Sequence, residues 1–445
     1  MSPLGALILI VLVAVLASAP RRWAALALIA GVLFLPQTQS VIIAGINLFS
    51  MRILEMVAVA RVLSRREHKD IVRTRVDLLL PIFFSYATVI FLLRSDEGFA
   101  YQIGLAVDAL TCYFSFRALI HDEADIRWLL KMTAGLLIPY TLIVVVESIT
   151  LENPFSSMGG VAYGGDWMRD GRLRCQGSFR HSSLLGTFGA SFFALYLSAA
   201  IGRFDRKYAY AGIALCLVII WACNSGGPIS CIANIVFCWI LWPLRKHLTL
   251  IKRGLLLLGV VMAFFMEAPI FYLPAKVSSL TGGDGWHRSF LMEISFHDLG
   301  SWWMFGMPLS NTIDWFPYHT PGTGFADITN QFLAYGIDSG LAAIILFVAV
   351  LVAAFREIKI VLSRVANQKK VTHPTAFLTW GLGAALVMHI ANWLGIIYFD
   401  QTYVIWYLQL AMISSLSNST RAQKVPLEVK NDEVEVTPID WARTP

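Results

Sequence analysis

The sequence predicts an all-α protein, a polytopic bundle of transmembrane helices. Of its 445 residues, 57% are hydrophobic and only 14% are charged, whereas a soluble domain carries about 25% charged residues. The charges gather in short loops between apolar runs about 15–25 residues long, the length that crosses a bilayer core as a helix. A β-barrel would need alternating strands of roughly ten residues, and runs such as LILIVLVAVLA do not alternate. Helices are expected because every backbone group in hydrocarbon must find a partner within its own segment.

We expect about 12 or 13 spans. The first segment, 1–20, has no positive charge before its apolar core and ends at Arg21 and Arg22. A cleaved signal peptide has the opposite polarity, so this segment is predicted to be the first membrane helix. The predicted spans are 4–19, 23–37, 41–60, 77–93, 101–118, 128–149, 183–201, 208–222, 229–243, 254–273, 330–355, 375–395 and 399–416.

The orientation follows from four short basic loops at 61–75, 203–207, 245–253 and 356–370. An even number of predicted spans separates each from the next, so all four can face the cytoplasm, the side that Lys and Arg favour. Two long loops then lie on the opposite face of the membrane. The predicted organisation is 1–149 N-terminal membrane helices, 150–182 first long loop, 183–273 central helices, 274–329 second long loop, 330–416 C-terminal helices and 417–445 cytoplasmic tail.

The net charge of +6 does not indicate nucleic-acid binding, because the cations lie mostly in the loops assigned to the cytoplasm. The six cysteines fall mostly within apolar helices, with no CxxC pair and no neighbouring histidine cluster. Such cysteines are typical of buried small hydrophobic residues, so the sequence predicts no structural metal site.

The first long loop ends in an arginine-rich segment, 169–186, that reads RDGRLRCQGSFRHSSLLG. Arginine offers a planar fork of donors that fits phosphate oxygens, and four arginines on this face oppose the usual charge bias. Ser182 and Ser183 can cap the helix that follows, and a helix N-terminus also attracts anions. The segment therefore predicts a phosphate-binding site at the membrane surface. Its arginines are Arg169, Arg172, Arg174 and Arg180.

The second long loop is rich in aromatic and titratable residues. GGDG at 282–285 and PGTG at 321–324 indicate a shaped loop, and an amphipathic helix is expected over 287–304. Its Trp residues fit two roles, as interfacial anchors or as platforms for sugar rings. Two interpretations of the long loops stay open at this point, a solvated cap without chemistry and a binding or catalytic site on the outer face.

Three ordered segments resemble the O-antigen ligase and O-antigen polymerase superfamily. They are RCQGSFRHSSLLG at 174–186, WHRSFLMEISFHDLGSWWMFGMP at 286–308 and DITNQFLAYGIDSGLAAIILF at 327–347, and the resemblance covers roughly residues 150–350. It implies a multi-pass glycosyltransferase of the bacterial inner membrane that takes a glycan from undecaprenyl diphosphate at the periplasmic face. It also implies that neither a metal nor another cofactor takes part.

By this resemblance, Arg174 and Arg288 engage the donor diphosphate, with help from Arg172 or Arg180. The family's ligases carry a histidine beside the asparagine of the third segment, where this chain has Thr329. The general base is therefore left open. Its candidates, in order of preference, are His319, Asp327 and Asp314, and the residues expected to contact substrate are Trp286, Asn330 and Gln331.

The resulting hypothesis is a polymerase that joins lipid-linked repeat units of an O-antigen or exopolysaccharide. Its acceptor is a second lipid-linked glycan, and a chain-length-determinant membrane protein is a candidate partner. A ligase that transfers the glycan to lipid A–core is the alternative within this class. A lipid-linked glycan flippase is the alternative from another class, and it needs polar groups at mid-membrane. Only Asp108 and Glu147 suggest such groups.

Overall fold

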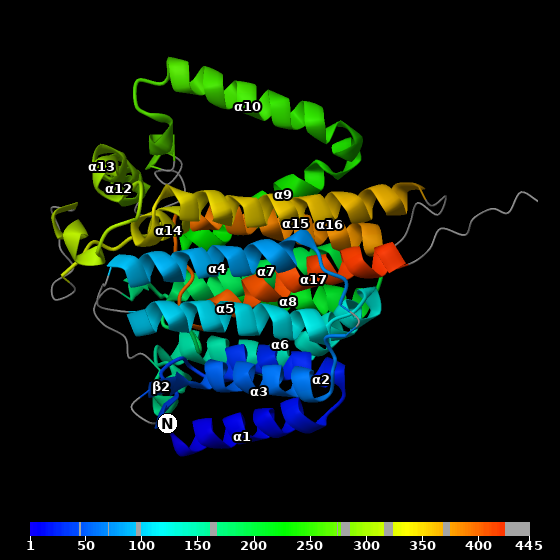
Figure 1. The fold of residues 1–445 in the computed structure, drawn as a ribbon. Coiled ribbons are helices and arrows are strands. Elements are labelled where there is room, and N and C mark those ends of the chain that lie inside the picture. Colours follow the sequence, from blue (N-terminus) through cyan, green and yellow to red (C-terminus); the bar gives the residue numbers. More distant parts are fainter. Residues whose placement is uncertain are drawn as a thin grey trace, which may run out of the picture.

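The chain forms an α-helical bundle in the computed structural model (Figure 1). Six helical segments are long and apolar enough to cross a membrane. The structure describes residues 1–43, 46–69, 71–94, 99–160, 167–273, 275–276, 285–315, 324–367 and 374–422. The six segments are α4 (Arg75–Arg94), α6 (Glu123–Thr150), α7 (Ser182–Ile201), Trp242–Phe265, α15 (Leu341–Asn367) and α16 (Pro374–Trp393).

The N-terminal part begins with two antiparallel apolar helices, α1 (Pro3–Ser18) and α2 (Arg21–Phe34). The predicted span 41–60 differs, because its first part forms a hairpin of β1 (Ser40–Ile43) and β2 (Ile46–Phe49). A run rich in β-branched residues favours strand over helix there. The remaining helices of this part are α3 (Ser50–Ser64) and α5 (Phe99–Leu119).

Helix α7 lies at the centre of the bundle and is buried along almost its whole length. It packs against α16 and against the antiparallel pair α8 (Arg206–Ala222) and α9 (Gly226–Ile240). Small residues allow the close approach, since a Cβ on Gly186 would lie 2.4 Å from the Pro228 ring. The helix that follows the arginine-rich segment is therefore held rigidly by the bundle.

The C-terminal part corrects two predicted boundaries. The expected span 330–355 is two helices, α14 (Gln331–Ser339) and α15, because Gly340 between them has φ +81° and a Cβ there would lie 2.4 Å from the Met304 carbonyl oxygen. The expected span 399–416 starts instead with a 3-10 turn, η5 (Asp400–Thr402), and continues as α17 (Tyr403–Ala422). The expected tail at 417–445 thus begins as helix, and residues 423–445 lie outside the described part.

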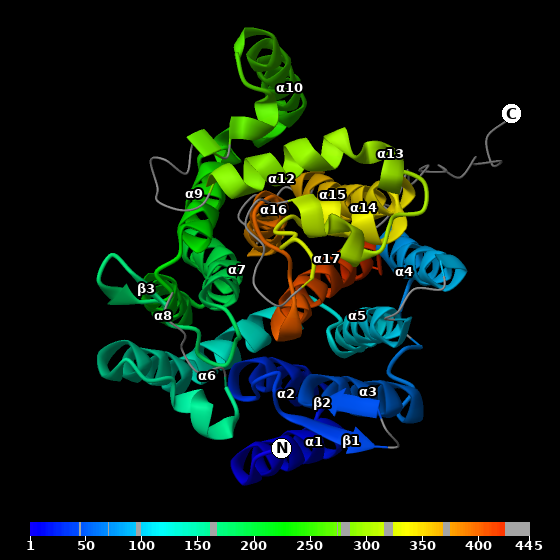
Figure 2. The ribbon, with the colours of Figure 1, turned by 90° about the vertical axis from the view of Figure 1, so that its left-hand side faces the viewer.

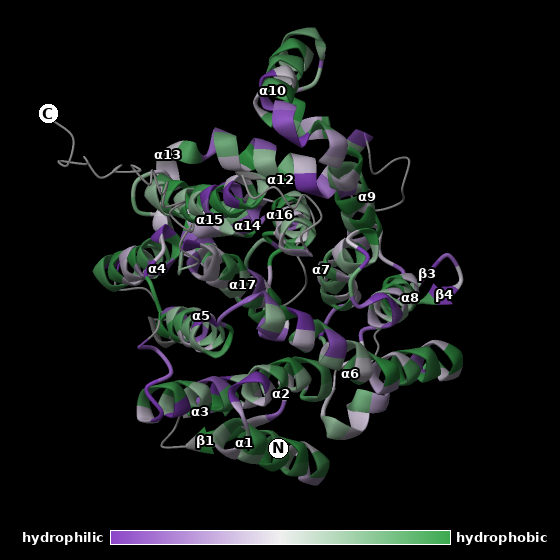
Figure 3. Ribbon diagram, turned by 90° about the vertical axis from the view of Figure 1, so that its right-hand side faces the viewer, coloured by the Kyte–Doolittle hydropathy of each residue, from purple (hydrophilic) through white to green (hydrophobic). Residues whose placement is uncertain are grey.

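Helix α10 (Leu248–Phe265) stands apart from the other helices (Figure 1). It follows the short turn η2 (Trp242–His247), and none of its residues is buried. Its side chains are apolar over most of its length, as the hydropathy colouring in Figure 3 shows. The helix packs mainly on η2 and on η3 (Ile270–Tyr272), the turns before and after it.

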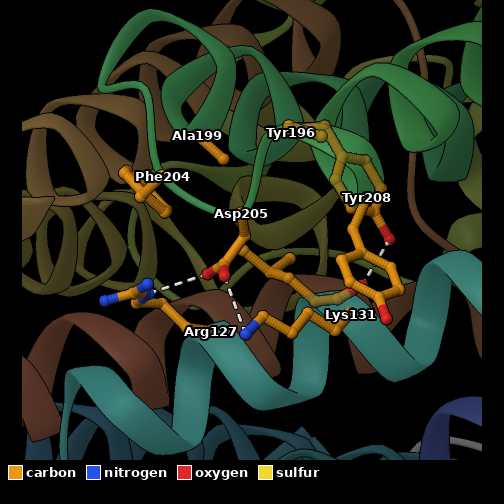
Figure 4. A pocket seen from close by; sticks show the side chains of 9 residues that line it. Arg127, Lys131, Tyr196, Ala199, Phe204, Asp205 and Tyr208 are labelled. Carbon is orange, nitrogen blue, oxygen red and sulfur yellow. Dashed lines mark hydrogen bonds and ion pairs between the residues drawn. The ribbon is translucent and has the colours of Figure 1, made fainter.

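The helices run up and down, so the described basic residues near the ends of α3, α7 and α15 lie at one end of the bundle and the described elements of the long loops at the other. Of the four predicted basic loops, 356–370 is mostly part of α15, and 248–253 belongs to α10. At the basic end, buried Arg117 donates to Asp77 at 3.3 Å and to Ser415. A shallow hollow nearby is closed by ion pairs of Asp205 with Arg127 (2.8 Å) and Lys131 (2.7 Å), which tie α6 to the turn between α7 and α8 (Figure 4). These contacts hold the helices together at the basic end of the bundle.

The described parts of the two long loops form short elements at the end of the bundle that faces the viewer in Figure 2. The hairpin of β3 and β4 lies beside α8, and α12 crosses the ends of the central helices. The elements are η1 (Pro154–Met158), β3 (Met168–Arg169), β4 (Arg172–Leu173), η3, α12 (Gly285–His297), α13 (Leu299–Trp302) and η4 (Leu309–Trp315).

Candidate functional site

The segment between β4 and α7 is fixed by a buried carboxylate at the end of α6. Glu147 accepts hydrogen bonds from the backbone N–H groups of Gln176 (2.8 Å) and Gly177 (2.9 Å). Gly177 has φ +56°, and a Cβ there would lie 2.5 Å from the Tyr140 hydroxyl oxygen. The side chain of Asn153 also donates to the Gly177 carbonyl. The position of the following arginine-rich turn is therefore set by the bundle.

Arg174 lies at the start of this turn, half-buried, and its Nε is buried without a hydrogen-bond partner. Burial and the charge of Arg169 both lower the pKa of the Arg174 guanidinium. Of the described carboxylates, none forms an ion pair with Arg174. Two cations close together without a counter-ion make a site that favours an anion.

His181 stands beside Arg174 and caps α7. Its Nδ1 accepts the N–H of Ser183 at 3.1 Å. Burial, and then the charges of Arg174 and Arg169, lower the pKa of His181 to about 4, so the ring is neutral at neutral pH. In the neutral ring with an accepting Nδ1, the proton sits on Nε2. His181 is therefore a hydrogen-bond donor beside the Arg174 guanidinium.

The N-terminus of α7 adds a second favourable feature. The hydroxyl of Ser182 is buried without a hydrogen-bond partner, and Ser183 bonds Ser225 at the start of α9, 2.7 Å away. The first N–H groups of a 20-residue helix carry partial positive charge. Arginine, neutral histidine and helix N-terminus thus converge on one anion-favouring site.

The other two arginines expected to help are engaged elsewhere. Arg172 lies 3.9 Å above the Trp221 ring and donates to the Trp221 carbonyl at 3.0 Å. Arg180 forms a two-point ion pair with Asp400, at 2.6 and 2.5 Å. Both guanidinium groups are therefore held by other groups of the protein, whereas Arg174 has no carboxylate partner among the described residues.

Arg288 lies in the first turns of α12, over the bare face of Gly395. A Cβ on Gly395 would lie 2.9 Å from the Arg288 Nε and 3.0 Å from its Cζ. Trp286 is half exposed and stacks on Phe290, with ring centroids 5.0 Å apart. The helix thus brings an arginine and an accessible indole to the long-loop end of the bundle.

Asn330 and Gln331, which were expected to contact substrate, form hydrogen bonds within the protein. Asn330 caps α14 by accepting the N–H groups of Phe332 and Leu333, and Gln331 accepts the N–H of Tyr398 at 2.8 Å. Both side chains therefore serve the fold directly.

Two of the three expected bases lie in the described part. Asp327 is exposed, but the protein around its carboxyl removes part of the water and so raises its pKa. The nearby His287 has a smaller effect in the opposite direction. Asp314 is exposed on η4. His319 lies outside the described residues. Of these two carboxylates, Asp327 has the surroundings that suit a general base better than those of Asp314.

The connection between α16 and α17, residues 394–402, links the two halves of the site. It contacts Arg288 through Gly395, α14 through Tyr398 and the arginine-rich turn through Asp400. Gln401 adds a bond from its amide to the Ser178 carbonyl at 2.9 Å. Sequence reasoning missed this connection because it assigned 399–416 to a span. The available signal was a charged residue, Asp400, at the first turn of an apolar run.

Helix α12, which carries Arg288, and the hairpin of β3 and β4, which directly precedes Arg174, belong to the same end of the bundle (Figure 2). A chain of contacts connects them, from the α7 N-terminus through Ser225 to the start of α9. There a Cβ on Gly227 would lie 3.5 Å from the amide oxygen of Asn392 at the end of α16, three residues before Gly395. The two arginines thus flank one set of helix ends.

Comparison with models of known protein families and with curated proteins gave no match for this chain.

Proposed function

We propose that the chain is a membrane glycosyltransferase that polymerises undecaprenyl-diphosphate-linked repeat units of a surface polysaccharide at the periplasmic face of the bacterial inner membrane. The observation that carries the proposal is Arg174. Its guanidinium is half-buried, lacks a carboxylate partner in the described part, and lies beside Arg169 and a neutral, donating His181. This arrangement suits a diphosphate better than a single carboxylate, because several donors converge from different directions.

In the proposed reaction, an acceptor hydroxyl attacks the anomeric carbon of the donor glycan and the lipid diphosphate leaves. The bond from the anomeric carbon to the diphosphate oxygen breaks, and Arg174 and His181 stabilise the charge that develops on that oxygen. Arg288 serves the same diphosphate from α12. Asp327 or His319 accepts the proton of the acceptor hydroxyl, with Asp314 as the third choice.

A flippase receives less support, because both carboxylates that suggested a transport path make static contacts. Glu147 binds the backbone of the arginine-rich turn. Asp108 pairs with Arg52 through two hydrogen bonds, at 2.5 and 2.7 Å. Neither side chain is a free polar group lining a path.

The test is glycan analysis of cells that carry Arg174→Ala or Arg288→Ala, with membrane levels of each variant confirmed. Arg172→Ala is the matched control, since it removes the same charge from the same segment but from a guanidinium that Trp221 already holds. We expect Arg174→Ala to lower polymer formation about 100-fold or more and single lipid-linked repeat units to accumulate. Arg172→Ala should change it only a few-fold.

Two outcomes would redirect or contradict the proposal. Long polymer that stays on undecaprenyl diphosphate, unattached to lipid A–core, would identify a ligase. An unchanged glycan profile in both Arg174→Ala and Arg288→Ala would contradict a role of these arginines in transfer.

A further inference from the structure

A group of charged side chains lies buried among α3, α5 and α17, away from the site described above. Glu55 on α3 is 0% exposed, and Asp108 on α5 is 7% exposed. Arg52, one turn before Glu55, donates from Nε and Nη2 to the two oxygens of Asp108. One arginine therefore stands beside two carboxyl groups.

The hydrogen bonds divide these two carboxyl groups into different roles. Both carboxylate oxygens of Asp108 are taken by Arg52, which makes this pair electrically neutral. Glu55 forms no hydrogen bond with Arg52. Its Oε1 accepts from the Tyr403 hydroxyl at 2.9 Å, and its Oε2 lies 3.3 Å from Oγ1 of Thr111.

The Thr111 hydroxyl is a weak hydrogen-bond donor to Glu55. It has one hydrogen, and its shortest contact is 2.7 Å to the Val107 carbonyl oxygen, which can only accept. Its contact with Glu55 Oε2 is longer, at 3.3 Å. A proton on Glu55 would turn this contact into a hydrogen bond that Glu55 donates to Thr111.

The charge balance places that proton on Glu55. With Arg52 and Asp108 already neutral together, an ionised Glu55, which is 0% exposed, would leave a net negative charge enclosed by the helices. An unpaired buried charge costs several kcal/mol. Glu55 lies five residues into α3, roughly 8 Å along the helix from its first residue.

We propose that Glu55 carries a proton in the folded protein, so that α3, α5 and α17 form a buried proton-binding site beside the fixed Arg52–Asp108 ion pair. The other titratable groups facing it are Cys112 on α5 and Tyr403 and Tyr407 on α17. These groups are neutral in their ordinary forms at neutral pH. They supply no cation that could replace the proton.

The site is coupled to the connection at the long-loop end. Tyr403 is the first residue of α17 and directly follows η5, which contains Asp400. The hydrogen bond that Tyr403 donates to Glu55 therefore ties the first turn of α17 to α3, directly after the turn that holds Arg180. Proton release requires the contact of α3, α5 and α17 to open to water.

The test is infrared spectroscopy of the full-length protein in lipid nanodiscs at neutral pH. We expect the wild-type spectrum to contain a carboxylic-acid C=O band that Glu55→Gln removes. Tyr403→Phe keeps the ring but removes the donor to Oε1, so the same band should shift in that variant. A spectrum in which no acid band responds to Glu55→Gln would overturn the proposal, and so would a band that Tyr403→Phe leaves in place.

Thermal unfolding gives a second, independent readout. Glutamine can accept from Tyr403 and donate to Thr111, so Glu55→Gln should leave the unfolding temperature unchanged. Asp108→Asn strips Arg52 of its partner and should lower it clearly. An equal loss in both variants would mean that Glu55 is charged and shares Arg52, which contradicts the proposal.

Discussion

Arg180 and Asp400, 220 positions apart in the sequence, form an ion pair in which each carboxylate oxygen accepts one guanidinium donor. The Asp400 side chain is 3% exposed and that of Arg180 is 50% exposed. The pair fastens the connection between α16 and α17 to the arginine-rich turn. We assign Arg180 a positioning role on this ground, and Arg174 the role of the anion-binding arginine.

The first prediction concerns this pair. Arg180→Ala leaves a buried carboxylate without its partner, and we expect a loss of about 1–3 kcal/mol in the free energy of unfolding, less than for a fully buried pair because Arg180 is half exposed. Combining it with Asp400→Asn should recover part of that loss, because the double variant leaves no unpaired charge. Thermal unfolding of Arg180→Ala, of Asp400→Asn and of the double variant measures these changes in stability. A double variant as unstable as the sum of the two single variants would show that the residues act independently.

The second prediction concerns Gly177. A methyl group there meets the Tyr140 hydroxyl and also requires an L-residue at φ +56°, so Gly177→Ala should lower the unfolding free energy by about 2–4 kcal/mol. Gly171→Ala is the matched control, because Gly171 has φ +73° but open space around it. It should cost about 1 kcal/mol. Equal losses in the two variants would mean that the contact with Tyr140 contributes nothing.

The third prediction concerns pH. The pKa of His181 is about 4 in the folded protein and about 6.5 in an unfolded chain. The unfolded state thus binds more protons between these values, so His181 makes stability fall as the pH drops from about 6.5 towards 4. His181→Asn keeps an oxygen for the cap and should show a flatter fall. Unfolding temperatures of both proteins across this window provide the measurement, and parallel curves would contradict a buried, neutral His181.

The fourth prediction uses Gly395 to displace Arg288 without removing its charge. Gly395→Ala places a methyl group 2.9 Å from the Arg288 Nε and 3.0 Å from its Cζ, which is too close, so the Arg288 side chain must shift. Because that guanidinium ends a flexible side chain, stability should change by less than about 1 kcal/mol. Polymer formation should nevertheless fall about tenfold or more, since catalysis depends on placement within about an ångström. Gly383→Ala, on α16 with contacts beyond 3.6 Å, is the control.

A fall in polymer formation for Gly395→Ala that Gly383→Ala shares would reflect the helix rather than Arg288. Full activity in Gly395→Ala would show that the position of Arg288 is unimportant for the reaction.

The sequence predicted the helical class and the approximate places of most helices, because apolar runs and basic loops alternate clearly along the chain. It failed where local chemistry interrupts an apolar run. Gly340 breaks one expected span, and the hairpin before Ser50 replaces part of another. Hydropathy counts apolar residues but does not register a backbone turn inside an apolar run.

The site was predictable only in part. The density of arginines pointed to the segment before α7, and the resemblance put Arg174 ahead of Arg172 and Arg180, but the spacing itself gave no physical reason for that order. That distinction depends on Trp221 and Asp400, which come from other parts of the chain. Glu147 was noted for the wrong reason, as a hint of transport, because its two backbone partners are visible only in three dimensions.

The exposure of α10 has a consequence for handling the protein. No residue of this helix is buried by the described part of the chain, so the surrounding solvent sets its environment on every side. In a bilayer that solvent is hydrocarbon, and annular lipid takes the place that side chains of neighbouring helices occupy elsewhere. Extraction into a short-chain detergent exchanges that lipid for small, mobile molecules. The rate of amide hydrogen exchange in α10 should therefore rise at a lower detergent concentration than the rate in α7.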